Sequence, residues 1–198
     1  MEGKGITERQ SINVAYGGRT ESFTYLAAKS VFREKALLTG STSMKAVFEQ
    51  VQSGIADYGV LALESSSHGS IHSVYDALLN QEGAITIVAE LGQSEEHCFC
   101  TDKSAAVFQI SEVYGHPVVL ECCNAFLSDI DVKRASRGLP DLKKIPTADS
   151  VDAVIAARAA SNGNIQAAAI ASKEAALANG MFAAVKGVGN DGNAEVGA

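Results

Sequence analysis

The sequence lacks the marks of a membrane protein and of a nucleic-acid-binding protein. No apolar run approaches the roughly 18 residues that a membrane-spanning helix needs, so we expect no membrane span. The formal net charge is -7, and no basic stripe with interleaved aromatic residues is present, which argues against a nucleic-acid partner. The amino terminus has no apolar core of a secretory signal. With 46% hydrophobic and 20% charged residues, the 198-residue chain has the composition of a globular protein.

Cysteine is scarce, and its spacing fits neither a zinc site nor a disulfide framework. The four cysteines are Cys98, Cys100, Cys122 and Cys123. One C-x-C and one adjacent pair do not match the C-x-x-C spacing of structural zinc sites, so we predict reduced thiols in or near a core. His68 and His72 are four residues apart, but no third metal ligand is apparent. We therefore expect no metal and no cofactor.

Strand and helix patterns alternate along the chain, which predicts an α/β fold with a mainly parallel sheet covered on both faces. The expected strands are residues 14–16, 58–63, 84–91 and 167–171, and the expected helices are residues 23–32, 44–52, 71–79, 150–160 and 173–179. A helical pattern also covers residues 116–127, with Pro117 suited to the first turn. Residues 1–12 are polar and predict a mobile tail. Residues 133–144 are basic and contain Gly and Pro, which predicts an exposed connection.

The most informative stretch is residues 47–79, where a helical repeat leads into a buried strand, a serine-rich turn and a second helix. The first backbone N–H groups of that second helix lack intrahelical partners and point toward the turn, so the turn can bind an anion. Ser65, Ser66 and Ser70 are therefore candidate ligands. Serines before an apolar helical run are also natural N-caps, and the residues alone leave both interpretations open.

A glycine-rich turn after the first expected strand offers a second set of ligands. It combines backbone amides from a glycine pair with two hydroxyls and one cation. These groups belong to Gly17, Gly18, Ser22, Thr24 and Arg19. An ordinary tight turn is the alternative interpretation, because glycine after a strand is common in turns.

A third turn opens a helix in the second half of the chain. Its hydroxyl residues, Thr147 and Ser150, are further candidate anion ligands. The alternative is a plain N-cap in which Asp149 complements the helix dipole. Asp149 would repel an anionic ligand if it faced the site, so its presence counts against a carboxylate site there.

Taken together, these motifs resemble the catalytic domain of the prephenate dehydratase family. The matching segments are the opening strand and turn at residues 14–28, Glu64-Ser65-Ser66, His97-Cys98, the histidine-proline turn at residues 114–117, the helix start at residues 147–150 and the strand at residues 168–172. The resemblance implies a two-lobed, periplasmic-binding-protein-like (type II) α/β fold with a cleft between the lobes. It extends from about residue 13 to residue 198, with lobe one at about 13–102 plus 183–198 and lobe two at about 103–182.

The resemblance also implies a substrate. The family acts on prephenate or arogenate, a ring dienol with two carboxylates that aromatises by losing carbon dioxide and hydroxide, so the protein must hold two anions and protonate one departing hydroxyl. We thus expect a small dicarboxylate ligand, a cytoplasmic or plastid-stromal location, and a homo-oligomer or larger assembly. The expected cleft residues are Ser22, Thr24, Ser65, Ser66, Ser70, Thr147 and Ser150, with Arg19 as a further candidate.

Several positions depart from the family pattern. The family's last motif is a threonine-arginine-phenylalanine triplet, in which the threonine is taken as the catalytic hydroxyl and the arginine as a carboxylate ligand. The matching positions here are Glu195, Val196 and Gly197. The loop asparagine is replaced by Ser65, and the second glycine of the opening turn is replaced by Glu21. We therefore predict a dehydratase-like domain with impaired or lost activity, a pseudoenzyme that serves as a binding or scaffold subunit.

Two alternatives stay open. One is a working prephenate or arogenate dehydratase, a carbon-oxygen lyase, in which Thr24, Ser22 or Arg19 replaces the lost triplet. The other is a periplasmic-type solute binder, which the absence of an export signal disfavours. The sequence ends where this family usually continues into an ACT regulatory domain, so we expect no feedback by phenylalanine through such a domain.

Overall fold

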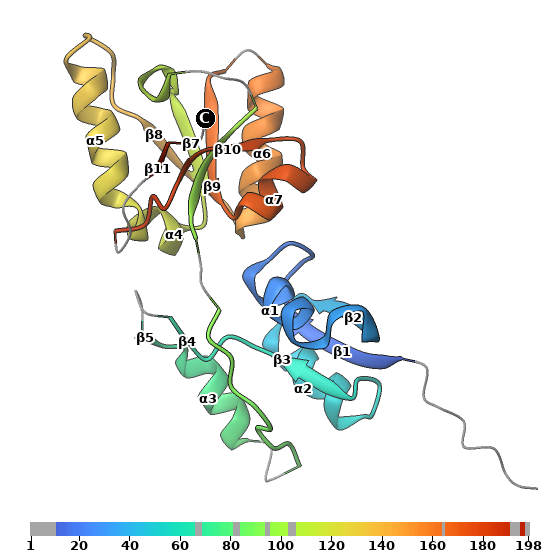
Figure 1. Cartoon of the computed structure of the whole chain (residues 1–198). Helices are drawn as coiled ribbons and strands as arrows, with labels where there is room; N and C mark the ends of the chain where they lie inside the picture. The colour runs from blue at the N-terminus through green and yellow to red at the C-terminus, as the bar shows by residue number, and fades with distance from the viewer. Residues whose placement is uncertain are drawn as a thin grey trace, which may run out of the picture. The chain divides into compact units, whose positions relative to one another are not determined.

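The computed structural model describes residues 11–65, 69–80, 84–93, 96–102, 106–163, 165–190 and 195–196. The chain forms two compact units, unit 1 at residues 1–93 and unit 2 at residues 94–198. Each unit contains a main sheet of its own, and both sheets can be followed in Figure 1. Within the described residues, no helix combines the length and the apolar character that crossing a membrane would require.

Unit 1 is built on a three-stranded parallel sheet in the order β2-β1-β3. Its strands are β1 (Ile12–Gly17), β2 (Ala36–Ser41) and β3 (Tyr58–Val60). In the register of the sheet, Gly17 lies beside Ser41 and Tyr16 lies beside Val60. Because the strands are parallel, their carboxyl ends lie at one edge of the sheet, and the segments that follow them begin there.

Helices cover both faces of this sheet. The helices of unit 1 are α1 (Phe23–Phe32), the short 3-10 helix η1 (Arg33–Lys35), α2 (Met44–Gln52) and α3 (His72–Leu79), and a hairpin of β4 (Glu64–Ser65) and β5 (Gly69–Ser70) precedes α3. Successive side chains of β1 point to opposite faces. Val14 and Tyr16 pack with Ala28 of α1, whereas Ala15 packs with Val47 of α2. The predicted arrangement of helices on both faces of a parallel sheet is confirmed in this unit.

Unit 2 contains a six-stranded mixed sheet in the order β11-β10-β6-β9-β7-β8. Its strands are β6 (Cys98–Thr101), β7 (Glu112–Gly115), β8 (Lys143–Pro146), β9 (Ala167–Ala171), β10 (Phe182–Lys186) and β11 (Glu195–Val196). β7 runs parallel to β8 and β9, whereas β6 is antiparallel to β9 and β10. β10 is also antiparallel to β11, so parallel pairing does not dominate this sheet.

The core of unit 2 lies on both faces of its sheet. The helices are η2 (Val107–Gln109), α4 (Pro117–Cys122), α5 (Asn124–Ala135), α6 (Ser150–Asn162) and α7 (Lys173–Ala178). On one face, Leu127 of α5 packs in one cluster with Ile170 of β9. On the other face, Val154 and Ala157 of α6 pack in a second cluster with Ala169. The small alanine side chains let α6 approach the sheet closely, which is how a strand of four alanines and one isoleucine can be fully buried.

Residues 84–91 do not form the strand that their apolar, β-branched composition predicts. The side chains of Ile87 and Val88 are 59% and 73% exposed. Strand propensity favours an extended backbone, but a strand also needs a hydrogen-bonded neighbour, and this segment has none among the described residues.

The basic segment at residues 133–144 is more ordered than an exposed connection. α5 continues through Arg134, which is buried, and Leu142 is also buried just before β8 begins at Lys143. A buried arginine needs acceptors for its N–H groups, and Arg134 finds them in backbone carbonyls. Part of this basic segment is therefore buried, although its composition predicts exposure.

Strands expected in the first lobe occur in the sheet of unit 2. β6 lies within residues 13–102 and β10 lies almost entirely within residues 183–198, yet these strands pair with each other, and β6 also pairs with β9. Antiparallel backbone pairing fixes both to unit 2, which sequence periodicity alone does not reveal. Residues 1–10 of the expected tail lie outside the described residues, and β1 begins at Ile12.

Candidate anion-binding site

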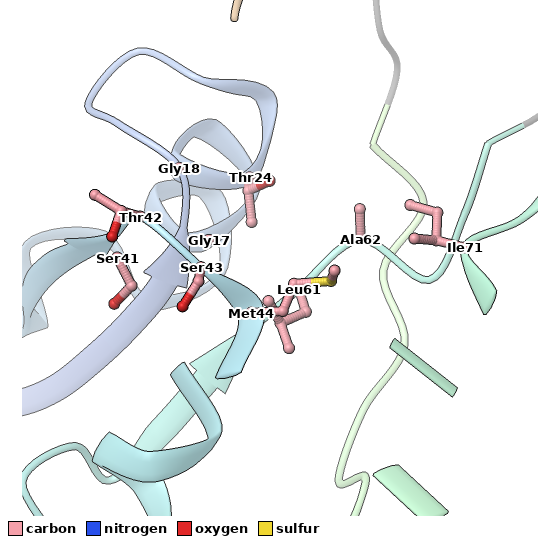
Figure 2. A pocket seen from close by; sticks show the side chains of 10 residues that line it. All are labelled: Gly17, Gly18, Thr24, Ser41, Thr42, Ser43, Met44, Leu61, Ala62 and Ile71. Carbon is pink, nitrogen blue, oxygen red and sulfur yellow. The ribbon is translucent and has the colours of Figure 1, made fainter. Parts of the chain in front are cut away.

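A cavity of about 440 Å³ lies at the carboxyl edge of the unit 1 sheet and is shown in Figure 2. It is lined by residues from the ends of β1 and β2, the first turns of α1 and α2, and the segment after β3. These residues are Gly17, Gly18, Thr24, Ser41, Thr42, Ser43, Met44, Leu61, Ala62 and Ile71. We call this cavity the strand-end pocket. All of its lining residues belong to unit 1.

Main-chain contacts hold the ends of β1 and β2 together at the pocket. The backbone N–H of Gly18 donates to the carbonyl oxygen of Ser41 at 2.8 Å. Gly18 has a φ of +105°, a conformation that glycine adopts without strain. A Cβ atom on Gly40 would lie 2.7 Å from the carbonyl oxygen of Gly18. Glycine at position 40 is therefore what permits this close approach of the two chain segments.

Two helices begin at the pocket with serine N-caps. At the start of α1, the Ser22 Oγ accepts a hydrogen bond from the Tyr25 N–H at 3.2 Å. At the start of α2, the Ser43 Oγ accepts one from the Ala46 N–H, also at 3.2 Å. Each cap satisfies one N–H group, and the other N–H groups of a first turn have no intrahelical acceptor. Because a helix N-terminus also carries partial positive charge, the pocket favours an anion.

The pocket has a polar side and an apolar side. In Figure 2, Ser41, Thr42 and Ser43 lie on one side, whereas Ala62 and Ile71 lie on the other. Met44 and Leu61 also contribute side chains that carry no hydrogen-bond donor. The arrangement suits a ligand with an anionic group at one end and a hydrocarbon body at the other.

The opening turn lies at this pocket, and its three candidates differ in position. Thr24 lines the pocket. Ser22 caps α1. A Cβ atom placed on Gly18, which lines the pocket, would lie 3.2 Å from the Ser22 Oγ, so Ser22 is adjacent to the pocket lining. Arg19 is exposed and is not among the lining residues. Among the residues that the structure describes, the lining contains no cationic side chain, and the groups it offers to an anion are helix N-termini and hydroxyls.

Three hydroxyl residues at the end of β2 also line the pocket and are not among the candidates predicted from the sequence. Ser41, Thr42 and Ser43 directly precede the helix that begins at Met44. The usable signal was the same one that identified the serine cluster at residues 65–70, a run of hydroxyl residues before an apolar helical repeat. Without a predicted strand that ends at Ser41, the sequence does not place this run at the edge of a sheet.

Glu64 contacts two residues that follow the serine-rich segment after β3. The Glu64 carboxylate accepts hydrogen bonds from the Ser70 Oγ at 3.2 Å and from the Tyr75 hydroxyl at 3.0 Å. The hydrogen bond to Glu64 raises the pKa of Tyr75 above its ordinary value. Ser65 pairs with Gly69 in the β4-β5 hairpin. Ser66 lies outside the described residues.

Glu21 occupies a backbone conformation that favours glycine. Its φ is +67°, in the left-handed region, where an L-residue with a side chain is strained. The family resemblance expects a glycine at this position. A glycine would adopt this conformation without strain, so the glutamate side chain adds strain to the turn.

The candidates of the second half, Thr147 and Ser150, lie in unit 2 at the start of α6. The N-cap is Asp149, whose carboxylate accepts a hydrogen bond from the Asp152 N–H at 2.7 Å. The Thr147 hydroxyl donates to the carbonyl oxygen of Asp149 at 2.9 Å. Ser150 is the first residue of the helix. These contacts match the interpretation of the turn as a helix cap in which the acid complements the dipole.

The triplet positions fall at the last described strand. Glu195 and Val196 form β11 and pair with Lys186 and Val185 of β10. Gly197 lies outside the described residues. That the candidates of both units line one cleft stays a prediction.

The cysteines take no part in the strand-end pocket. All four are buried and unpaired with one another, as predicted for reduced core thiols. Burial raises the pKa of Cys98 to about 11 and that of Cys123 to about 12. Such thiols are protonated and unreactive at neutral pH. Across the described part of the chain, no group of three or more His, Cys, Asp and Glu side chains is placed to hold a metal ion.

Comparisons with known proteins agree on one family. A family model described as prephenate dehydratase matches residues 14–194. The bifunctional chorismate mutase/prephenate dehydratase of Escherichia coli (strain K12) is 32% identical over 121 residues, which is 60% of this chain and 31% of that protein. Arogenate dehydratase/prephenate dehydratase 2, chloroplastic, of Arabidopsis thaliana is 25% identical over 189 residues, which is 95% of this chain and 45% of that protein. The chain thus spans less than half the length of these two curated relatives.

A solved structure supports the same fold. The prephenate dehydratase of Arthrobacter aurescens in complex with L-Phe is similar with a TM-score of 0.75 at 18% identity, covering 92% of this chain and 58% of that one. This likeness confirms the predicted fold class, a periplasmic-binding-protein-like (type II) α/β fold. At this identity the likeness concerns the fold, and the activity has to be argued from the site.

Proposed function

This chain belongs to the prephenate dehydratase family, and from that premise we propose that it binds a small dicarboxylate such as prephenate or arogenate in the strand-end pocket. We further propose that its dehydratase activity is impaired or lost and that it acts as a binding or scaffold subunit, in a homo-oligomer or a larger assembly. The observation that carries the proposal is the convergence of two serine-capped helix N-termini on a pocket whose other side is apolar. Cytoplasm or plastid stroma is the proposed location.

The chemistry of the pocket matches one end of such a ligand. Hydroxyls and free helix N–H groups can hold a carboxylate, and the side formed by Leu61, Ala62 and Ile71 can pack against a six-membered ring. A dicarboxylate has a second anion, for which Thr147 and Ser150 are the proposed ligands. Asp149 at the same helix start disfavours that second contact, because its carboxylate already occupies the N-terminus of α6.

The proposal of impaired activity rests on the substituted triplet. Glu195 and Val196 supply neither a hydroxyl nor a cation, and the described pocket lining has no cationic side chain to replace one. Loss of one transition-state donor commonly costs about 10²- to 10³-fold in rate. We therefore expect little or no phenylpyruvate from prephenate, and little or no phenylalanine from arogenate.

An active dehydratase is the second candidate, and the position of Thr24 favours it. Its hydroxyl lines the pocket, so it could protonate a departing hydroxyl group of the substrate. Ser22 is a weaker candidate because it caps α1 beside the pocket and is not among the lining residues. If Thr24 is the acid, Thr24→Val should abolish turnover while Thr24→Ser retains it.

Two measurements on the same preparation test the proposal. Calorimetric titration with prephenate and with arogenate reports binding, and chromatography of the products reports turnover. Binding without turnover supports the proposal, whereas a turnover number in the common enzyme range of about 1 to 10³ per second supports the active alternative. Absence of binding to either compound would contradict both.

Restoring the family residues asks whether the loss is local. The triple variant Glu195→Thr, Val196→Arg and Gly197→Phe returns a hydroxyl and a cation and removes one carboxylate. Each restored charge-assisted hydrogen bond should contribute about 1.5 to 3 kcal/mol, so activity should rise measurably above the parent. A folded variant that binds prephenate but gains no activity would place the defect outside the triplet.

A further inference from the structure

We propose that Gln50 orients the Ser41 hydroxyl as a hydrogen-bond donor to an anion bound in the strand-end pocket. The Gln50 Nε2 lies 2.7 Å from the Ser41 Oγ, and its amide hydrogen can only be donated. The oxygen of Ser41 is therefore the acceptor in this contact, and its own hydrogen must point elsewhere. Gln50 would be a positioning residue, because it acts on the ligand through Ser41. The inference deepens the proposed function and rests on it for the ligand class.

Ser41 is built into the pocket rather than placed at its rim. Its side chain lines the cavity, and the residue is only 5% exposed. Its backbone carbonyl is fixed by the 2.8 Å hydrogen bond from the Gly18 N–H. Among the described residues, no hydrogen bond gives the Ser41 hydroxyl hydrogen an acceptor. A buried donor without an acceptor is costly, and an anionic oxygen in the pocket would supply one.

Gln50 can hold this orientation because both partners are fixed by secondary structure. Ser41 ends β2, and Gln50 lies on α2, the helix that begins at Met44 in the pocket wall. The contact therefore spans the loop of Thr42 and Ser43 and ties the last strand residue to the helix. Because the Gln50 amide donates to the Ser41 oxygen, the Ser41 hydroxyl hydrogen is left for another acceptor. The hydroxyl then acts as a hydrogen-bond donor in the pocket, together with the first-turn N–H groups of α2. The pocket then presents donors on its polar side, which selects an anion over a neutral acceptor or a cation.

Paired variants separate this role from packing. Ser41→Val and Ser41→Thr have the same branched shape, but only the threonine keeps a hydroxyl. Gln50→Glu keeps the length of the side chain but presents an acceptor, so the Ser41 hydroxyl would turn toward the new carboxylate. Gln52→Glu adds the same charge to the same helix at an exposed position and controls for long-range electrostatics.

Binding is measured by NMR titration of labelled full-length protein with prephenate and, in parallel, with inorganic phosphate. The amides of Gly18, Ser43 and Met44 report occupancy of the pocket. Ser41→Val should weaken binding of both probes by about 10- to 100-fold, the usual cost of losing one hydrogen bond to a charged group, while Ser41→Thr stays near the parent. Gln50→Glu should weaken binding at least about 10-fold, and Gln52→Glu by no more than about twofold because its charge is exposed and screened.

The outcomes distinguish this inference from the proposed function. If phosphate binding shows the predicted pattern but prephenate does not bind, the Ser41 and Gln50 roles stand and the proposed function fails. If prephenate binds equally to Ser41→Val and Ser41→Thr, or equally to Gln50→Glu and Gln52→Glu, the proposed function stands and this inference is overturned. If neither probe shifts the pocket amides of the parent protein, both are overturned.

Discussion

The helix starts of unit 1 and unit 2 differ in their caps and in the space beside them, and the difference shows what makes an anion site. In unit 1, α1 and α2 begin with the neutral hydroxyls of Ser22 and Ser43 beside a cavity. In unit 2, α6 begins with the carboxylate of Asp149, and α7 begins with Ser172, which is buried. An anion near α6 would meet a negative charge, and one near the Ser172 cap would need space in the core. A helix N-terminus therefore becomes a candidate site only where a neutral cap and a cavity occur together.

The two units also differ in how they are stabilised. The described clusters of unit 1 are small, and main-chain contacts at Gly18 and Gly40 define its pocket. Unit 2 has two larger clusters, filled by alanine, thiol and branched aliphatic side chains, on either side of its sheet. Changes in the core of unit 2 should therefore lower stability and spare the pocket, whereas changes at the glycines of unit 1 should affect the pocket.

The largest expected effect is in unit 2, at Arg134. Its Nε donates to the Pro140 carbonyl at 2.7 Å, and its Nη1 donates to the carbonyls of Phe108 at 2.9 Å and of Ile110. Arg134→Met would leave these acceptors without a donor and should lower the free energy of unfolding of unit 2 by about 3 kcal/mol. Hydrogen exchange of the β7 and β9 amides measures the loss.

A matched control for this change lies one turn further along the chain. Arg137 is exposed and sits over the Phe108 ring at 4.1 Å, so Arg137→Met should cost only about 0.5 to 1 kcal/mol. Ligand binding in the strand-end pocket should stay unchanged in both variants. An equal loss of stability in the two variants would contradict the role of Arg134 as the buried donor.

The second prediction concerns Gly40 in unit 1, where a substitution should affect the pocket as well as stability. Gly40→Ala forces a Cβ to within 2.7 Å of the Gly18 carbonyl, so the turn must shift. We expect unit 1 to lose about 2 kcal/mol of stability and the pocket to lose prephenate binding, as overpacking usually costs about 1 to 3 kcal/mol. Gly92→Ala is the control, because a Cβ there meets open space. Calorimetric titration with prephenate measures the affinity of each variant. If the Gly40→Ala variant folds and binds with the affinity of the parent, the close approach does not shape the pocket.

The third prediction concerns alkaline pH and the buried thiols, all of which lie in unit 2. Burial raises the pKa of Cys98 from its ordinary 9.0 to about 11 and that of Cys123 to about 12. Above 9.0 the unfolded chain releases thiol protons that the folded chain retains, so stability must fall as the pH rises toward about 11. The slope should reach about 1.4 kcal/mol per pH unit for each thiol.

Urea unfolding at a series of pH values measures this slope. Replacing both Cys98 and Cys123 by alanine should reduce this slope without abolishing it, because burial also raises the pKa of Cys100. A slope that stays the same in the double variant would assign the alkaline loss to other groups. Tyr114 is one of them, because burial raises its pKa to about 12.

The smallest expected effect is that of a substitution at Glu21, in the opening turn of unit 1. Glu21→Gly relieves the strain of a side chain at φ +67° and should stabilise unit 1 by about 0.5 to 1 kcal/mol, the left-handed penalty less the entropy cost of glycine. Thermal unfolding of the variant and the parent, scanned side by side, would detect the difference. A destabilised variant would mean that interactions of the Glu21 side chain outweigh its strain.

The sequence predicted some elements to the residue and others not at all. α1, α2 and β9 lie at the predicted positions, because serine caps or buried apolar runs mark their ends. The strand expected at residues 84–91 does not form, since its pairing depends on distant segments that local composition does not describe. β2 was missed because its short apolar core is followed by Thr39 and Gly40, which are common in turns.

A residue of the candidate site could be predicted from the sequence only where the neighbouring strand or helix could be predicted. Thr24 was identified because its glycine-rich turn follows an obvious strand. Ser41 was not, because a residue at the end of an unpredicted strand offers no local signal of burial. Its partner Gln50 is an ordinary helix residue in sequence, and only the fold places its amide 2.7 Å from the Ser41 oxygen.

The hydrogen bond between the Gly18 N–H and the Ser41 carbonyl has a consequence for engineering. It is made of main-chain atoms, so it survives when neighbouring side chains are exchanged. A library that randomises Thr42, Met44 and Leu61 would therefore vary the chemistry of the pocket while its frame stays in place. Such a library offers a route to receptors for different small molecules, with Gly18 and Gly40 as the two positions to keep constant.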